Sequence, residues 1–326
     1  MHFIKYTVSL FALTLISHYL SGNEYKEFSQ KCMGTDFRIL IDHDDYELSA
    51  EAARNAFLEC NRLNKIFSDY IADSEVSKLS NSSFQNQSLQ LSKELFDILT
   101  YSKSLAMKTN GAFDPTLGQT SRLWRISRFR KALPSKKTVL EALQRKGVQF
   151  LELENKSREA RLTKEGILID LGGVAKGHTA DEMILILNKN GITRCLIDAG
   201  GDLSLGNPPR GKKGWKIEIG GNKHPDLPIL TLSNCSIATS GDIEQFVEIE
   251  GTRYSHIIDP KTGYGLQNIT QTTVIAPKGI IADSLATAGN VLGPSKFKKV
   301  FKDDHKIQAF FLSQKEKSGE FTLIKI

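Results

Sequence analysis

Apolar positions along this chain follow two different periods, and the change of period predicts an α+β protein. Phe37, Ile39 and Ile41 alternate with polar residues, as in a half-buried strand. Over residues 53–67, and again over 95–106, apolar residues recur every three or four positions, as on one face of a helix. Further helices are predicted near 138–146 and over 179–190. A last helix is predicted over 283–292, where Gly293 and Pro294 would end it.

Runs typical of strands dominate the second half of the chain. They cover residues 195–197, 215–219, 229–232, 246–249 and 272–275, and the short apolar run 167–171 is also predicted to be a strand. Helices gathered in the first half and strands in the second are typical of α+β folds rather than of regular βαβ winding. No repeat and no long linker divides the chain, so a single domain is expected over residues 23–326.

Composition and charge narrow the class of protein. The chain has 326 residues, of which 40% are hydrophobic and 25% charged, as in an ordinary globular protein with a large core. The net charge is +6, but lysines and arginines are mixed with acids and form no basic stripe, so no nucleic-acid partner is expected. The four cysteines, Cys32, Cys60, Cys195 and Cys235, lack zinc-ligand spacing. A disulfide is possible in an oxidising compartment, but the spacing assigns no pair.

The first 22 residues are predicted to be a signal peptide. Lys5 precedes an apolar stretch over residues 6–20, and the small residues Ser21 and Gly22 follow before a polar segment begins. The stretch is short for a membrane span and His18 interrupts it. We therefore expect an exported, periplasmic protein, with membrane association as the alternative if the segment is retained.

Two similar glycine-rich turns are candidate phosphate sites. In residues 170–177 and 198–202 an apolar run ends in an aspartate, which a small or apolar residue and two glycines follow. Backbone N–H groups in such turns, with a helix N-terminus, can bind an anion, and Lys176 could contact a phosphate or a flavin oxygen. The plainer alternative is a pair of tight turns in which aspartates cap the backbone.

Three more segments carry possible chemistry. His256 and Asp259 lie three residues apart in the turn-forming segment 254–263, which follows residues 239–242, and could serve in acid–base catalysis. Asp283 and Thr287 lie one helical turn apart and offer the oxygen ligands that Mg²⁺ prefers, although an inert helix start would look the same. The turn over residues 111–118 places an aromatic ring beside an aspartate.

Taken together and in this order, these segments resemble the ApbE family of FAD:protein FMN transferases. The resemblance extends from Met33 to Thr287 and implies an α+β, T-fold-like architecture of two lobes with the FAD pocket between them. It implies FAD contacts by Met33, Tyr70, Ala112, Phe113, Asp114, Asp170, Lys176 and Ile257. It implies a magnesium site made by Gly173, Asp283, Ala286 and Thr287.

The resemblance also implies a reaction. The FMN moiety of FAD would be transferred to a threonine or serine hydroxyl of an acceptor protein, with release of AMP, and the acceptor would be a subunit of a membrane redox complex. Asp283 would act through the metal, and His256 or a nearby aspartate would take the proton of the hydroxyl. Two alternatives stay open: a pyrophosphatase that splits FAD into FMN and AMP, and a non-catalytic periplasmic flavin-binding protein. The arginine-rich residues 122–136 match no motif.

Overall fold

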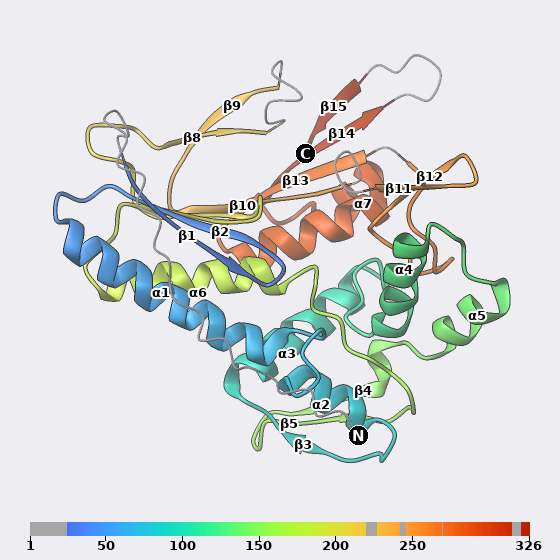
Figure 1. The fold of residues 1–326 in the computed structure, drawn as a ribbon. Coiled ribbons are helices and arrows are strands. Elements are labelled where there is room, and N and C mark those ends of the chain that lie inside the picture. The colour runs from blue at the N-terminus through green and yellow to red at the C-terminus, as the bar shows by residue number, and fades with distance from the viewer. Residues whose placement is uncertain (1–24, 220–226, 242–245, 269, 315–320) are drawn as a thin grey trace, which may run out of the picture.

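The computed structural model describes residues 25–326 except 220–226, 242–245, 269 and 315–320. The predicted signal peptide and Asp242 lie outside the described residues. The centre of the molecule is an antiparallel sheet of eight strands (Figure 1). In spatial order these are β1 (Lys26–Cys32), β2 (Thr35–Ile41), β6 (Cys195–Ala199), β7 (Leu203–Leu205), β10 (Cys235–Gly241), β13 (Thr270–Ala276), β14 (Gln308–Gln314) and β15 (Phe321–Lys325).

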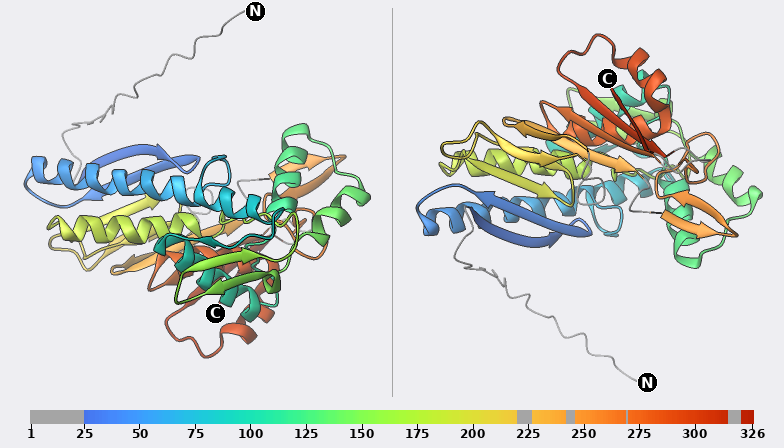
Figure 2. Two further views of the ribbon diagram at one scale, coloured as in Figure 1. Left: turned by 90° about the horizontal axis from the view of Figure 1, so that it is seen from below. Right: turned by 90° about the horizontal axis from the view of Figure 1, so that it is seen from above.

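Three helices pack against one face of this sheet: α1 (Tyr46–Phe67), α6 (Ala175–Lys189) and α7 (Gly279–Phe301) (Figure 2). The apolar side of α1 that the sequence predicts is buried against β1, β2 and α6. Asp45 caps α1 by accepting a hydrogen bond from the Leu48 N–H at 3.0 Å. On the opposite face, the hairpin of β8 (Trp215–Glu218) and β9 (Ile229–Leu232) packs over a smaller apolar cluster.

The segment between α1 and α6 forms most of a second lobe. It contains α2 (Glu75–Ser82), α3 (Lys93–Lys108), α4 (Gly118–Arg130), α5 (Lys136–Gln144), a short 3₁₀ turn (Val148–Phe150) and a three-stranded sheet of β3 (Leu89–Gln90), β5 (Glu159–Leu162) and β4 (Leu151–Glu154). The hairpin of β11 (Phe246–Ile249) and β12 (Thr252–Ser255) lies beside α4 (Figure 1), because Trp124 packs against Val247 and Tyr254.

Two sequence predictions need correction. Ile167, Ile169 and Leu171 are buried, but residues 167–171 form only an isolated bridge, Leu117 to Leu168, because the Ile169 N–H donates to the Ser80 hydroxyl rather than to a strand. The last helix begins at Gly279 rather than at residue 283. Gly293, with φ 69°, interrupts it where predicted, but a second helical run then continues to Phe301.

No helix in the described part of the chain combines the length and the apolar character needed to span a bilayer.

Candidate active site

Helices α6 and α7 begin in contact with each other, and their first turns frame the candidate site. A Cβ on Gly177 would lie 2.2 Å from the Gly279 carbonyl oxygen, so only glycine permits this approach. The Gly177 N–H donates to Asp283 Oδ2 at 3.1 Å. Asp181 caps α7 by accepting hydrogen bonds from the N–H groups of Gly279 and Ile280, at 2.6 and 3.1 Å. The two helix starts are thus fixed to each other by polar contacts.

Asp283 is a buried carboxylate rather than an exposed residue of a helix start. Its side chain belongs to the second turn of α7 and only 5% of the residue is exposed. Burial, and then the neighbouring Asp202, raise the pKa of Asp283 to about 7. In the described part of the chain, no lysine or arginine forms an ion pair with it; the nearby Lys176 pairs with Asp202. A buried carboxylate that has no positively charged partner is suited to bind a cation.

The other predicted metal ligands come from the next turn of α7 and from the glycine-rich turn that packs against it. The Thr287 hydroxyl oxygen is 2.9 Å from where a Cβ on Gly173 would stand, so the backbone of the glycine-rich turn passes directly against the α7 side chain. The Ala286 carbonyl oxygen is buried in α7 and accepts a hydrogen bond from Asn290 Nδ2 at 2.9 Å. These are hard oxygen donors, which fit Mg²⁺.

One carboxylate alone would make an incomplete cation site. Within the described ranges, no group of three or more histidine, cysteine, aspartate or glutamate side chains is placed to hold a metal ion. A magnesium ion at Asp283 would therefore need ligands from water or from a phosphorylated substrate, as is usual for this ion.

The two glycine-rich turns meet through an ion pair. Lys176, from the first turn, pairs with Asp202, from the turn between β6 and β7. Burial lowers the pKa of Lys176, but the carboxylates of Asp202 and Asp283 raise it by more than burial lowers it. The net shift of the pKa is therefore upward. The lysine stays protonated and stands beside the Asp283 carboxylate. This meeting of both turns supports the reading that they act together, against the alternative of two unrelated tight turns.

A further candidate residue, Arg125, escaped the sequence analysis. Its guanidinium binds Asp69 at 2.6 Å and Asp170 at 3.1 Å, and it lies 4.3 Å from the ring centroid of Tyr70. Tyr70 itself is 76% exposed. Arg125 therefore contacts two of the predicted FAD contacts at once. Nothing in the local sequence distinguishes it from Arg122, Arg128 and Arg130 on the same helix.

The predicted turn after α3 lies against the strand-like run that leads to Asp170. The Asp170 N–H donates to the Pro115 carbonyl at 2.8 Å, which aligns the two segments. Ala112 and Phe113 are buried. Asp114 accepts hydrogen bonds from the Thr116 N–H and hydroxyl, at 2.9 and 2.6 Å, while its burial raises the pKa of the carboxyl. The structure thus brings the segments of Asp114 and Asp170 together.

The segment of His256 is anchored to α4 rather than to α7. Trp124 Nε1 donates to the Ser255 carbonyl at 3.0 Å, and the Ile257 N–H donates to the Ser255 hydroxyl at 3.0 Å. Ile257 is buried and His256 is half-buried. Asp259 accepts a hydrogen bond from the Lys261 N–H, which is the arrangement of an Asx turn. The role of His256 as a base stays a prediction.

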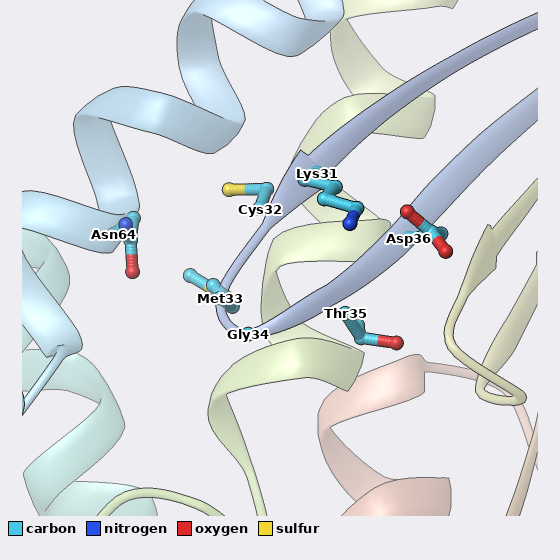
Figure 3. A pocket seen from close by; sticks show the side chains of 7 residues that line it. All are labelled: Lys31, Cys32, Met33, Gly34, Thr35, Asp36 and Asn64. Carbon is cyan, nitrogen blue, oxygen red and sulfur yellow. The ribbon is translucent and has the colours of Figure 1, made fainter.

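Met33 occupies the turn between β1 and β2. Its backbone has φ 49°, in the left-handed region, and the Thr179 hydroxyl lies 3.6 Å from its sulfur, so the turn reaches α6. A hollow of about 540 Å³ opens at this turn (Figure 3). Met33 lines it together with Asn64, whereas the other seven predicted FAD contacts do not line it.

Comparison with known proteins decides the family. The model of the ApbE family matches residues 33–311. The chain belongs to the ApbE family. The FAD:protein FMN transferase of Escherichia coli K12 is 32% identical over 287 residues, which are 83% of this chain and 79% of that protein. The transferase class expected from the sequence is therefore confirmed.

Solved structures confirm the fold. The ApbE protein of Thermotoga maritima superposes with a TM-score of 0.81 at 28% identity, covering 91% of this chain and 96% of that one. A histidine-to-glycine variant of the flavin transferase ApbE from Vibrio cholerae gives a TM-score of 0.80 at 26% identity, with 93% and 97% covered. The predicted α+β, ApbE-like architecture is thus confirmed.

Proposed function

We propose that this chain transfers the FMN half of FAD to a threonine or serine hydroxyl of another protein and releases AMP. The observation that carries the proposal is the meeting of Lys176, Asp283, Thr287 and the Gly173 backbone at the joined starts of α6 and α7. A pyrophosphate needs backbone donors, a cation and a metal-binding carboxylate, and this site can supply the three. The name of the curated relatives, FAD:protein FMN transferase, supports the transfer of FMN from FAD to a protein.

Each residue has a proposed task in this reaction. Asp283 and Thr287, with the backbone oxygens of Gly173 and Ala286, would hold Mg²⁺. When bound, Mg²⁺ would neutralise charge on the pyrophosphate and on the leaving AMP. Lys176 would contact a phosphate oxygen or the flavin. Asp170 and Tyr70, held by Arg125, would position the FAD.

The bond changes balance without a further reactant. The oxygen of the acceptor hydroxyl attacks the phosphorus of the FMN half and forms a phosphoester. The bond from that phosphorus to the bridging oxygen breaks, and the bridging oxygen leaves on AMP. The hydroxyl proton passes to a base, for which we propose His256. Water in place of the hydroxyl would give FMN and AMP instead.

Intact-mass analysis of a candidate acceptor tests this proposal directly. After incubation with the protein, FAD and Mg²⁺, the acceptor should gain one FMN per modified hydroxyl, and AMP should appear in equal amount. EDTA should abolish both products, and excess Mg²⁺ should restore them. AMP and free FMN without an acceptor adduct would indicate a pyrophosphatase. Binding of FAD without any AMP would indicate a flavin-binding protein.

We further propose that the protein is exported, with an acceptor in a membrane redox complex. The proposal depends on the predicted signal over residues 1–22. N-terminal sequencing of the protein from its native host should start near residue 23. A mature protein that begins at Met1 and stays in the cytoplasm would contradict it.

A further inference from the structure

Two buried thiols face each other beneath the turn that carries Met33. Cys32 is the last residue of β1 and Cys60 lies in the middle of α1, and their sulfur atoms are 2.7 Å apart. Cys32 is 5% exposed and Cys60 is fully buried. Figure 3 shows the Cys32 sulfur pointing towards α1. The fold therefore places in contact two cysteines that stand 28 positions apart in the chain.

The remaining cysteines lie elsewhere. The Cys195 thiol is directed at the carbonyl groups of Ile192 and Thr193, at 3.7 and 3.9 Å. Cys235 packs with the apolar cluster on the opposite face of the sheet. All four cysteines are within the described residues, so the structure singles out one pair where the spacing in the sequence could not.

The contact shifts the pKa values of the two thiols in opposite directions. A hydrogen bond from Cys60 lowers the pKa of Cys32, against the opposing effect of burial. The same contact and burial raise the pKa of Cys60. In the closed fold Cys32 therefore has more thiolate character than Cys60.

We propose that Cys32 and Cys60 are an intramolecular disulfide site that fixes the Met33 turn to α1. The oxidant is a disulfide-bearing thiol reagent or oxidoreductase. The thiolate of one of the two cysteines attacks one sulfur of that disulfide, forms a mixed disulfide and expels one thiol. The other cysteine then attacks the sulfur of the first and expels the second thiol. The cysteines lose two electrons and two protons, and the external disulfide is reduced to two thiols. Because both sulfurs are buried, this exchange takes place before the β1–β2 hairpin closes on α1, or while it is open.

The disulfide would act on the candidate active site through Met33, the neighbour of Cys32. Met33 follows Cys32 directly, holds a left-handed backbone and contacts Thr179 of α6. A cross-link from Cys32 to α1 would restrict the opening of this turn and would also reduce the freedom of the unfolded chain. The effect on FAD binding rests on the proposed function, whereas formation of the bond does not.

The test starts from the full chain refolded with oxidised glutathione or kept in a reducing agent. Each sample is denatured and alkylated, and its intact mass is measured by mass spectrometry. The oxidised protein should accept two alkyl groups and the reduced protein four, one for each cysteine. Trypsin should release residues 32–38 and 55–62 as one linked species from the oxidised sample alone. Cys195→Ala and Cys235→Ala should keep the link, and Cys32→Ala should abolish it. Four alkyl groups after oxidation, or a link between other cysteines, would overturn the proposal.

Two further measurements separate this proposal from the proposed function. The oxidised protein should melt about 5 °C above the reduced protein, and Cys60→Ala should show no such difference. FAD titration should give a several-fold lower Kd for the oxidised protein. A linked protein that binds no FAD in either state would contradict the proposed function and leave the disulfide standing. A linked protein with an unchanged melting temperature and unchanged FAD affinity would overturn the claim that the bond fixes the turn.

Discussion

The properties of single side chains in this site follow from where they are buried. Asp283 shows this most clearly, because the aspartate predicted from the sequence to bind Mg²⁺ is a core residue with its pKa raised to about 7. A buried carboxylate without its own ion pair destabilises the fold unless a cation is bound. The same residue therefore links the stability of the protein to its proposed chemistry.

Asp283→Asn separates these two effects. The amide retains the shape of the side chain and can accept the hydrogen bond from the Gly177 N–H, but it removes the charge that would bind Mg²⁺. FMN transfer should fall by roughly two orders of magnitude or more, and the melting temperature without metal should stay the same or rise. Thr287→Ser, which keeps the hydroxyl, is the matched control and should transfer at near the wild-type rate. Wild-type transfer by Asp283→Asn would show that the metal site is misassigned.

Arg125 is expected to act by positioning Asp170 and Tyr70, the predicted FAD contacts that it touches. Arg125→Gln would leave Asp69 and Asp170 facing each other, and the pKa of Asp69 is already raised by burial and by Asp170. The KM for FAD should rise about tenfold with little change in kcat, because the substrate is misplaced while the reacting groups remain. Arg122→Gln, an exposed arginine of the same helix, is the control. An equal change in both variants would indicate a general charge effect instead.

At the scale of elements, the site depends on the close approach of α6 and α7. Neither helix start could be placed from local sequence: α7 is capped by Asp181, which lies 98 positions earlier in the chain. Likewise, Arg125 finds its partners 56 and 45 positions away. The amphipathic patterns of α1 and α3 were sufficient to predict those helices, because the residues of each apolar face lie within one segment. Contacts between elements depend on residues far apart in the chain and cannot be predicted from one segment.

Gly177→Ala tests the approach itself. Alanine in a helix interior is usually more favourable than glycine by about 1 kcal/mol, but here its methyl group would meet the Gly279 carbonyl. The two helices would have to separate, so the free energy of unfolding should fall by about 1–3 kcal/mol and Mg²⁺-dependent transfer should weaken. Asn188→Ala, on the exposed side of α6, should be neutral or slightly stabilising. Chemical denaturation of both variants gives the comparison, and a stabilised Gly177→Ala protein would refute the packing argument.

At the scale of the whole molecule, much of the architecture could be predicted but its assembly could not. The alternating and helical periods indicated the α+β class, and six of the predicted strands are present as β2, β6, β8, β9, β11 and β13. The prediction of a strand over the apolar run 167–171 was wrong, because a short apolar segment looks the same in sequence whether its hydrogen bonds go to a strand or to side chains. The order of the strands in the central sheet pairs β2 with β6, an arrangement that no local pattern encodes.

The stability of the whole molecule should fall in mild acid because of one histidine on α6. His178 packs against Phe67, and its Nε2 atom has no hydrogen-bond partner among the described residues. Burial lowers its pKa from 6.5 to about 4, despite the opposing effect of Asp97 and Glu94. His178 therefore binds a proton below pH 6.5 in the unfolded chain, but only below about pH 4 in the folded protein.

His178 should therefore not reduce the free energy of unfolding above pH 6.5. Below pH 6.5 the free energy of unfolding should decline as the pH falls towards 4. We expect a loss on the order of 2 kcal/mol, reduced from the full shift because the ring is only partly shielded from solvent. Urea denaturation at several pH values, compared with His178→Leu, isolates this contribution, since other acidic groups titrate alike in both proteins. The difference in unfolding free energy between wild type and variant should change across this interval and be constant above it. A constant difference from pH 4 to pH 8 would mean that His178 is already accessible to protons in the folded protein.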